Sequence, residues 1–248
     1  MFHKELEDYT GRLLEVDRFR DYCPNGLQVE GSRQIRKIAT GVTASLSFLE
    51  KARDEGADAV FVHHGYFWKS EDPSIKGIKR KRIALLIESG ISLFAYHLPL
   101  DAHPEIGNNA RLALRLGFSI DSRFGNQGIA MLGKVWNPAS AEEMAERIGN
   151  SLSRKPAIFG DKSKVIKSIA WCSGAAQDYL LEASSLGADA YLSGEISEQT
   201  VHEAEESGTV YICAGHHATE RYGIQALGEH LASAFSVEHV HIDTDNPI

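Results

Sequence analysis

Three short segments of the chain end in histidine, or in histidine followed four residues later by a carboxylate. Their residues are His63 and His64, His97 and Asp101, and His216 and Glu220. Imidazole nitrogens combined with carboxylate oxygens suit divalent transition metals such as zinc, manganese, iron and nickel. Five or six such ligands exceed the needs of one four-coordinate ion, so the sequence predicts a site for two divalent metal ions.

Predicted buried strands position these residues. The apolar run 57–62 is too short to span a membrane, and Gly65 closes it just after His63 and His64. Imidazoles that leave the carboxyl edge of a parallel sheet can converge on one ion or on two. Taken alone, two adjacent histidines are more often hydrogen-bonded loop residues, so the metal interpretation depends on ligands from the other segments.

An internal repeat relates the first part of the chain to the second. The tetrapeptide Gly-Ala-Asp-Ala at 56–59 recurs at 187–190, an offset of 131, and an Ile-Ala pair precedes each copy by eighteen residues. Helix-type sequence lies between the pair and the tetrapeptide in both copies. Two homologous β-α-β units are therefore expected.

The repeat also aligns the predicted ligands. Superposing 94–97 on 213–216, an offset of 119, places Asp101 on Glu220, whereas His63-His64 corresponds to Gly194-Glu195. We therefore predict an α/β fold of two similar halves, 1–124 and 125–248, that face each other across a metal-binding cleft. The polar, glycine-rich stretch 121–128 is taken as the boundary. His216 is preferred over His217 because it fits the repeat.

Local signals predict the elements around these strands. Apolar residues at helical spacing predict an opening helix over 6–16, and Leu27 to Gly31 is a candidate short strand. Ser45 stands where a helix cap is expected, and Gly90 should end a later helix. Ser140 and Glu143 have the spacing of a capping box.

The composition limits the class of protein. The 248 residues are 43% hydrophobic and 24% charged, which is typical of a globular chain. A net charge of −8 disfavours a dedicated nucleic-acid binder. Three widely spaced cysteines suggest no disulfide framework, and neither a signal peptide nor a spanning segment is recognisable. These features predict a soluble cytoplasmic protein that acts on a small molecule and does not enter a membrane.

Other residues near the predicted ligands are candidates for substrate binding or proton transfer. Tyr66 and Trp68 follow the first histidines, where aromatic side chains either plug the surface or contact a substrate. A basic run at 76–82 is either a solvated helix face or a phosphate contact. Arg221 is a third candidate substrate contact. His97 and Glu195 are the candidates for moving protons.

Four ordered motifs also carry a resemblance to a known family. They lie at 21–31, 62–68, 97–109 and 215–221 and together span nearly the whole chain. They resemble the Nif-three-like family, in particular its short bacterial YbgI-type members, which are labelled as homologues of GTP cyclohydrolase 1 type 2. The resemblance implies two similar α/β halves, a dinuclear metal site, and assembly into a ring-shaped (toroidal) homohexamer.

The metal ligands that the resemblance implies are the set collected from the repeat: His63, His64, Asp101, His216 and Glu220. The expected function is that of a dinuclear metal-dependent hydrolase, cyclohydrolase-like or amidohydrolase-like, with a small nucleotide-like or cyclic amide substrate. The alternative is a metal-binding regulatory or scaffold protein without catalysis. A ring that binds DNA is disfavoured by the charge.

Overall fold

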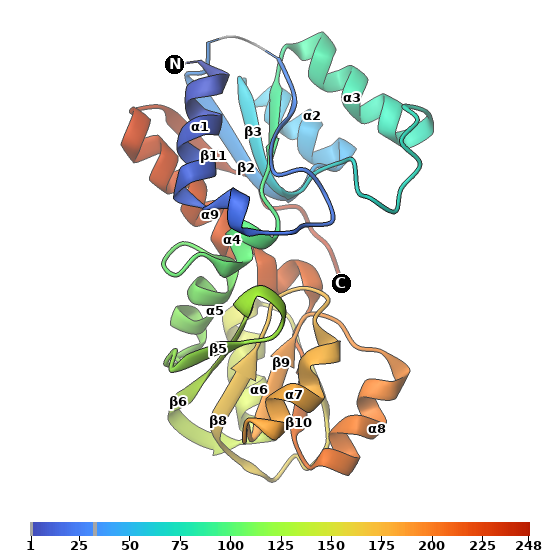
Figure 1. Cartoon of the computed structure of the whole chain (residues 1–248), viewed down its shortest axis with the longest axis vertical. Coiled ribbons are helices and arrows are strands. Elements are labelled where there is room, and N and C mark those ends of the chain that lie inside the picture. The colour runs from blue at the N-terminus through green and yellow to red at the C-terminus, as the bar shows by residue number, and fades with distance from the viewer. Residues whose placement is uncertain (1, 32–33) are drawn as a thin grey trace. The chain divides into compact units, whose positions relative to one another are not determined.

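The computed structural model describes residues 2–31 and 34–248, and the chain divides into two compact units. Unit 1 comprises Met1–Leu100 and Gly223–Asp245, and unit 2 comprises Asp101–Tyr222 and Asn246–Ile248. Two helices, α4 (Leu98–Ala102) and α9 (His216–Phe235), contain residues of both units (Figure 1). Each unit is described by itself.

Unit 1 is built on a sheet whose described strands run in the order β1-β4-β3-β2-β11. Strands β2, β3, β4 and β11 are parallel to one another. Strand β1 pairs antiparallel with β4 at the edge of the sheet. The elements of this unit outside α4 and α9 are α1 (His3–Leu13), η1 (Val16–Arg18), β1 (Gly26–Val29), β2 (Lys37–Thr43), α2 (Leu46–Asp54), β3 (Ala59–His64), α3 (Gly77–Ser89), β4 (Ser92–Ala95) and β11 (Glu238–His241).

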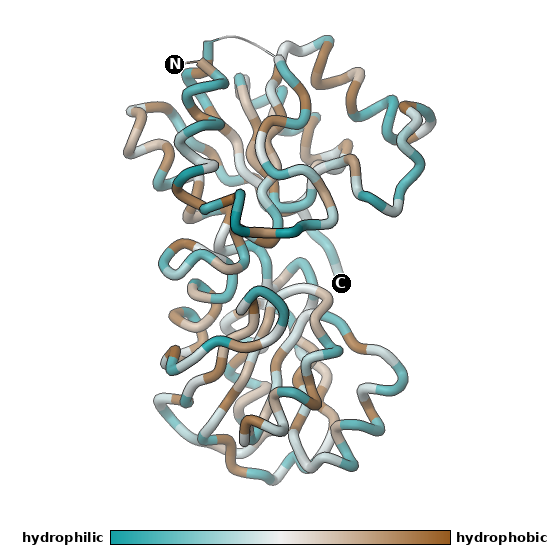
Figure 2. The backbone as a smooth tube through the Cα atoms, viewed as in Figure 1, coloured by the Kyte–Doolittle hydropathy of each residue, from teal (hydrophilic) through white to brown (hydrophobic). Residues whose placement is uncertain are grey.

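The core of unit 1 forms where α2 and α3 pack on one face of this sheet. Val60 and Val62 of β3 belong to the same buried cluster as Phe48 and Leu49 of α2 and Leu86 of α3. Figure 2 shows hydrophobic residues along the strands and hydrophilic residues in the loop that leads into α3. Burial of β3 on both faces explains its continuous apolar sequence.

Unit 2 is built on a sheet whose described strands run in the order β5-β6-β8-β9-β10-β7. Strands β8, β9 and β10 are parallel, and the other pairings are antiparallel. Its elements outside α4 and α9 are α5 (Asn108–Leu116), β5 (Ser122–Phe124), η2 (Asn126–Gly128), β6 (Ala130–Ser140), α6 (Ala141–Leu152), β7 (Ala157–Phe159), β8 (Val165–Trp171), η3 (Gln177–Tyr179), α7 (Leu180–Ser185), β9 (Ala190–Ser193), α8 (Glu198–Ser207) and β10 (Val210–Cys213).

The core of unit 2 is centred on Trp171, which is fully buried at the end of β8. It shares a cluster with Met144 and Ile148 of α6 and with Ile212 of β10. The indole Nε1 donates a hydrogen bond to the backbone oxygen of Asn109 at 3.0 Å. This bond satisfies the only polar atom of a buried indole and ties α5 to the sheet.

The same order of elements occurs in both units, as the sequence repeat predicts. The run β2-α2-β3-α3-β4 corresponds to β8-α7-β9-α8-β10, and each run ends beside an antiparallel edge strand. Ile38 pairs with Ala59 and Ile169 pairs with Ala190, so the offset of 131 relates equivalent positions in the two sheets.

The second offset is wrong by one residue. Ala59 pairs with Ser92 and Ala190 pairs with Val210, which lies 118 residues after Ser92. In this register His97 corresponds to Gly215 rather than to His216. The sequence alignment matched the histidines themselves, whereas strand pairing gives an offset of 118, and the helices that follow, α4 and α9, begin at Leu98 and His216, also 118 residues apart.

The repeated aspartate has the same structural role in both copies. Asp58 accepts hydrogen bonds from the backbone N–H groups of Arg36 and Lys37 at 2.8 and 3.1 Å. Asp189 accepts two equivalent bonds from Lys167 and Ser168, both at 3.0 Å. Each carboxylate therefore binds the two backbone N–H groups just before Ile38 or Ile169, the first residue of the neighbouring strand that pairs with β3 or β9, which explains why the tetrapeptide recurs.

Asp189→Ala should lower the free energy of unfolding by about 1–3 kcal/mol, because the partly buried N–H of Ser168 and the exposed N–H of Lys167 lose their acceptor. Urea denaturation followed by circular dichroism measures the change. Glu206→Ala, which removes an exposed carboxylate from α8, is the control and should shift the midpoint little. Equal midpoints for both variants would contradict this role for Asp189.

The sequence located most local elements correctly. Ser45 accepts a hydrogen bond from Phe48 N at 3.3 Å as the cap of α2, Gly90 ends α3 with φ +67°, and Ser140 forms the capping box of α6. The stretch 121–128 is not only a link, because Ser122–Phe124 forms strand β5 at the sheet edge.

The compact units differ from the predicted halves 1–124 and 125–248. The final strand, β11, pairs with β2, so the end of the chain belongs to unit 1. The predicted halves describe the sequence repeat, and that division stays a prediction.

Candidate metal centre

Strand β3 of unit 1 ends at His64, and the next strand, β4, is followed by His97. The ring centroids of His63 and His64 lie 4.6 Å apart, and His97 lies 5.0 Å from His63 and 5.8 Å from His64. Each ring offers a nitrogen, and these nitrogens all lie within 4.8 Å of one another. The strand end thus gathers three imidazoles, although adjacent strand residues point to opposite faces.

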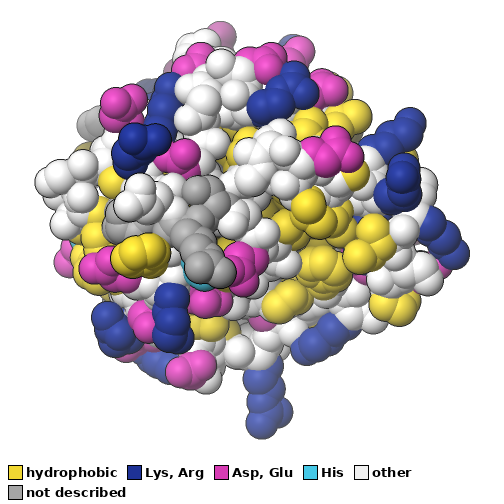
Figure 3. All heavy atoms as spheres, turned by 90° about the horizontal axis from the view of Figure 1, so that it is seen from above, with side chains coloured by type: hydrophobic (Ala, Val, Ile, Leu, Met, Phe, Trp, Pro, Cys, Tyr) yellow, Lys and Arg dark blue, Asp and Glu magenta, His cyan; other side chains and the backbone are white. Residues whose placement is uncertain are grey.

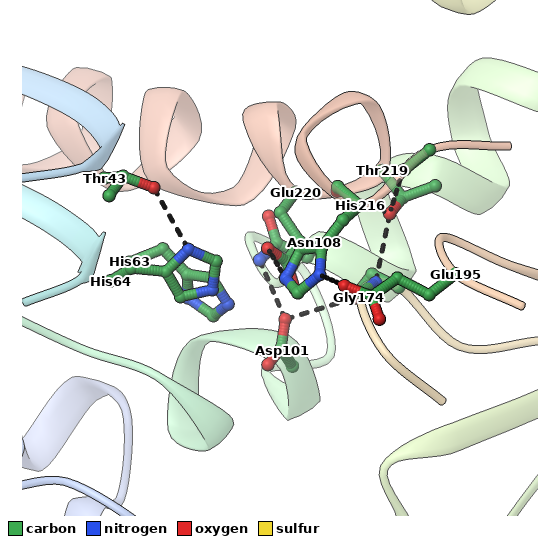
Figure 4. Close-up of polar contacts among 12 residues, drawn as sticks. Thr43, His63, His64, Asp101, Asn108, Gly174, Glu195, His216, Thr219 and Glu220 are labelled. Atoms are coloured by element: carbon green, nitrogen blue, oxygen red, sulfur yellow. Dashed lines mark hydrogen bonds and ion pairs between the residues drawn. The ribbon is translucent and has the colours of Figure 1, made fainter. Parts of the chain in front are cut away.

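Hydrogen bonds at Nδ1 hold the first two of these rings. His63 Nδ1 lies 2.9 Å from the backbone oxygen of Tyr96, and His64 Nδ1 lies 3.2 Å from Thr43 Oγ1 (Figure 4). A carbonyl oxygen can only accept, so Nδ1 of His63 has the proton and Nε2 has the lone pair. His63 is fully buried, which fits a ligand held rigidly before an ion binds.

Asp21 holds the ring of His97. Its Oδ1 lies 2.7 Å from His97 Nδ1. Burial raises the pKa of Asp21, but the hydrogen bond and charge of His97, with hydrogen bonds from Asn25 and Tyr22, outweigh it and lower the pKa to about 2. The carboxylate of Asp21 is therefore ionised at neutral pH.

In unit 2, Asp101 lies in α4 and is held by two neighbours. Asn108 Nδ2 donates to Asp101 Oδ1 at 2.8 Å, and Ser173 Oγ donates to the same oxygen at 3.1 Å (Figure 4). Ser173 is itself placed by Asn109, whose Oδ1 accepts from the Ser173 N–H at 2.8 Å. The orientation of the buried Asp101 carboxylate is therefore fixed.

The beginning of α9 supplies an imidazole and, four residues later, a carboxylate to the same unit. His216 Nε2 lies 3.0 Å from Glu220 Oε2, and Asp101 and Glu220 each offer an oxygen within 4.8 Å of the other. His216 Nδ1 lies 2.6 Å from Glu195 Oε1 (Figure 4). Burial lowers the pKa of His216, but Glu220 and Glu195 outweigh it and raise the pKa to about 9. A metal ion at Nε2 must therefore displace a proton.

Gly174 gives the Glu220 carboxylate the room it occupies. This glycine has φ +68°, and a Cβ added to it would lie 2.2 Å from Glu220 Oε1 and 3.4 Å from His216 Nε2. Its N–H donates to Thr219 Oγ1 at 3.0 Å (Figure 4). The absence of a side chain here is thus a requirement of the His216–Glu220 pair.

Gly174→Ala should reduce the zinc bound after reloading, because the methyl group displaces Glu220. Gly208→Ala is a matched control: Gly208 has φ +70° and nothing within 4 Å of its Cβ position. Both variants have the same backbone strain, of about 1–2 kcal/mol, but only in Gly174→Ala does the new methyl group contact the Glu220 carboxylate. Equal zinc content in the two purified variants, measured by mass spectrometry of the metal, would contradict this role.

These side chains fit divalent metal ions. In each of His63, His64 and His216, Nδ1 forms a hydrogen bond to an oxygen, which is the arrangement that directs Nε2 to a metal. The buried carboxylates Asp101 and Glu220 supply oxygen ligands within unit 2. Each unit therefore contains a His-rich or His-carboxylate group that could hold a metal ion.

The three predicted substrate contacts lie in different surroundings. Tyr66 is buried, and its hydroxyl donates to Ala44 O at 2.7 Å, which favours a packing role. The Trp68 ring lies 5.0 Å from His97 and 6.0 Å from His64. An Arg221 Nη donates to Leu152 O at 2.7 Å.

The basic run at the start of α3 includes two cations that pair with acidic residues. Lys76 lies 2.6 Å from Asp72 and Lys79 lies 2.6 Å from Glu71, which favours the solvated-face interpretation for these two. Ile78 and Ile87 of the same helix are exposed. Figure 3 shows that hydrophobic and basic side chains adjoin one another on this end of unit 1.

Sequence reasoning missed the outer partners of the histidines, namely Asp21, Thr43 and the Tyr96 carbonyl group. Asp21 lies 76 residues before His97, and no spacing connects them. No site role was predicted for Asp21, which lies in the segment 21–31 of the family resemblance. Cys23, near Asp21, is buried, and burial raises the pKa of its thiol to about 12.

Comparisons with known proteins cover the whole chain. The family described as Duf34/NIF3 (NGG1p interacting factor 3) matches residues 1–247. A Pseudomonas aeruginosa protein named "GTP cyclohydrolase 1 type 2 homolog" is 50% identical over 98% of this chain and 97% of its own length. A Vibrio cholerae protein of the same name is 49% identical over the full length of both. The solved structure of protein ybgI, titled as of unknown function, superposes with a TM-score of 0.97 at 46% identity over both full chains.

A search of the described residues for membrane-spanning helices found none of sufficient length and hydrophobicity.

Proposed function

The chain belongs to the Duf34/NIF3 family, and from this premise we propose that it is a dinuclear metal-dependent hydrolase. The proposed ligands of the two divalent ions are His63, His64, Asp101, His216 and Glu220. The proposed substrate is a small nucleotide-like or cyclic amide compound. The relatives named "GTP cyclohydrolase 1 type 2 homolog" support the nucleotide-like class.

One observation supports the metal site above the others. Every histidine of the proposed set has its Nδ1 hydrogen-bonded to an oxygen of a neighbouring residue in its own unit. The carbonyl partner of His63 leaves its lone pair on Nε2, and the carboxylate partner of His216 does the same once that ring has lost its extra proton. Thr43 Oγ1 holds the His64 ring at the same ring position.

The residues of the chain would then divide the work of hydrolysis. Two bound ions would lower the pKa of a bridging water and polarise the bond under attack. Glu195 keeps the His216 ring in place, and Asn108 and Ser173 hold Asp101. His97 lies beside His63 and His64 but is outside the proposed ligand set, and its imidazole is the proposed proton acceptor. Trp68, beside His97, is the proposed stacking surface for a planar ring.

Turnover assays on the metal-loaded protein test this function. Protein reloaded with zinc or manganese is assayed on a panel of nucleotides, pterins, cyclic amides and phosphoesters, with chelator-treated protein and Trp68→Ala as comparisons. We expect hydrolysis of at least one ring-containing substrate, loss of turnover on chelation, and weaker substrate binding in Trp68→Ala. No turnover across the panel despite full metal loading would favour the non-catalytic scaffold instead.

The proposed assembly is a ring-shaped homohexamer in the cytoplasm, which rests on the family resemblance. Light scattering coupled to size-exclusion chromatography should give a mass six times that of the chain. A monomeric or dimeric mass at micromolar concentration would exclude the ring.

A further inference from the structure

The segment before β1 contains a buried carboxylate whose partners all donate hydrogen bonds to it. Asp21 accepts from the N–H of Tyr22 at 2.6 Å, the N–H of Leu98 at 2.9 Å and Asn25 Nδ2 at 2.9 Å. Its fourth contact is His97 Nδ1, at 2.7 Å. Only 3% of the Asp21 side chain is exposed.

The orientation of Asn25 is fixed by the backbone. Asn25 Oδ1 accepts from the His97 N–H at 2.7 Å, and a backbone N–H can only donate. The amide nitrogen of Asn25 must therefore face Asp21. A carboxylate that already accepts three N–H bonds remains an acceptor toward its fourth partner, so His97 Nδ1 donates to it.

This arrangement determines which nitrogen of His97 can accept a proton. With Nδ1 protonated and bound to Asp21, the lone pair of the neutral ring is on Nε2. The His97 side chain keeps 15% of its surface exposed, whereas His63 is fully buried. The edge of the Trp68 ring, inclined at 83°, packs against the imidazole and limits its rotation.

We propose that Asp21 is the positioning residue that fixes His97 in its Nδ1–H form, so that Nε2 acts as the proton acceptor of the hydrolytic reaction. This inference rests on the proposed function for the reaction itself, but the tautomer does not depend on bound metal. Asp21 touches neither substrate nor metal in this role, and His97 is not a ligand of the ions.

The proton balance of the step is simple. As the oxygen of the attacking water bonds to the substrate, one O–H bond breaks and its proton moves to His97 Nε2. The resulting imidazolium is stabilised by the adjacent Asp21 carboxylate. When the scissile bond breaks, the same proton passes to the leaving nitrogen or oxygen and restores the neutral ring.

Solid-state NMR of the full chain labelled with ¹⁵N-histidine tests the proposal in zinc-loaded and metal-free protein. His97→Gln identifies the His97 signals, and Asp21→Asn is the test variant. In the wild type we expect a protonated Nδ1 and an unprotonated Nε2. In Asp21→Asn the new amide can donate to Nδ1, so we expect a shift toward the Nε2–H form.

Two controls keep the result specific. Asp17→Asn, at an exposed position in η1, should leave the His97 signals unchanged. Zinc content should be equal in Asp21→Asn and the wild type.

An unchanged tautomer in Asp21→Asn would overturn the proposal. A loss of zinc in that variant would also overturn it, because His97 would then be a metal ligand. A wild type that binds no metal would refute the proposed function, while the tautomer comparison would still report on Asp21.

Discussion

Glu220→Ala should lose most of the bound metal and all metal-dependent turnover. Glu220 is buried near the start of α9, 3.0 Å from His216 Nε2 and within 4.8 Å of an Asp101 oxygen. Its removal takes away an anionic ligand and also the charge that draws a cation to this part of unit 2. Metal analysis after reloading and dialysis gives the number of ions per chain.

Glu229→Ala is the matched control because Glu229 lies on the same helix but is exposed. It should keep the wild-type metal content. Circular dichroism checks that both variants are folded. A folded Glu220→Ala protein with full metal content would show that Glu220 is not a ligand. Asp101 would then be the one carboxylate in the proposed ligand set.

Glu195→Gln should weaken metal binding by about 10- to 100-fold, which is typical for the loss of a carboxylate that orients a ligating histidine. Glu195 Oε1 lies 2.6 Å from His216 Nδ1. The glutamine keeps the length of the side chain but removes the charge and can present its amide nitrogen to the ring. Competition with a zinc-binding dye measures the dissociation constant.

Glu198→Gln provides a control with the same chemistry elsewhere. Glu198 contacts His202 at 3.3 Å on the exposed face of α8, and the substitution should not change metal affinity. If Glu195→Gln binds zinc as tightly as the wild type but loses turnover, Glu195 acts in proton transfer, as the sequence alternative proposes.

Much of the fold could be predicted because single segments encode it. The strand before His63 and His64, the Ser45 cap and the Ser140 capping box each depend on residues within a few positions of one another. The repeat was visible because Asp58 and Asp189 have the same hydrogen-bonding role, and that role requires the same residue at the same place.

The parts that could not be predicted depend on long-range pairing. Strand β5 is three residues long and is defined by its pairing with β6, so its sequence has no detectable period. Strand β11 completes the first sheet from the far end of the chain. The one-residue error in the second offset has the same origin, because the register of β4 and β10 follows from their pairing with β3 and β9.

The candidate site also has parts that the sequence predicts and parts that depend on long-range contacts. The histidines and carboxylates stood out by type and spacing, whereas their outer partners did not. Asp21 and the Tyr96 carbonyl group reach His97 and His63 through the fold, and a carbonyl group has no sequence signal. Tyr66 had two interpretations from its position after the histidines, and the bond from its hydroxyl to Ala44 O favours packing, while its role as a substrate contact stays a prediction.

The most direct test of the dinuclear site is the number of metal ions per chain in protein purified without chelator or affinity tag, measured before and after reloading. We expect about two ions per chain, falling sharply in His64→Ala, because five ligands are more than one four-coordinate ion requires. No stoichiometric metal in the reloaded wild type would contradict the dinuclear site and with it the proposed hydrolase.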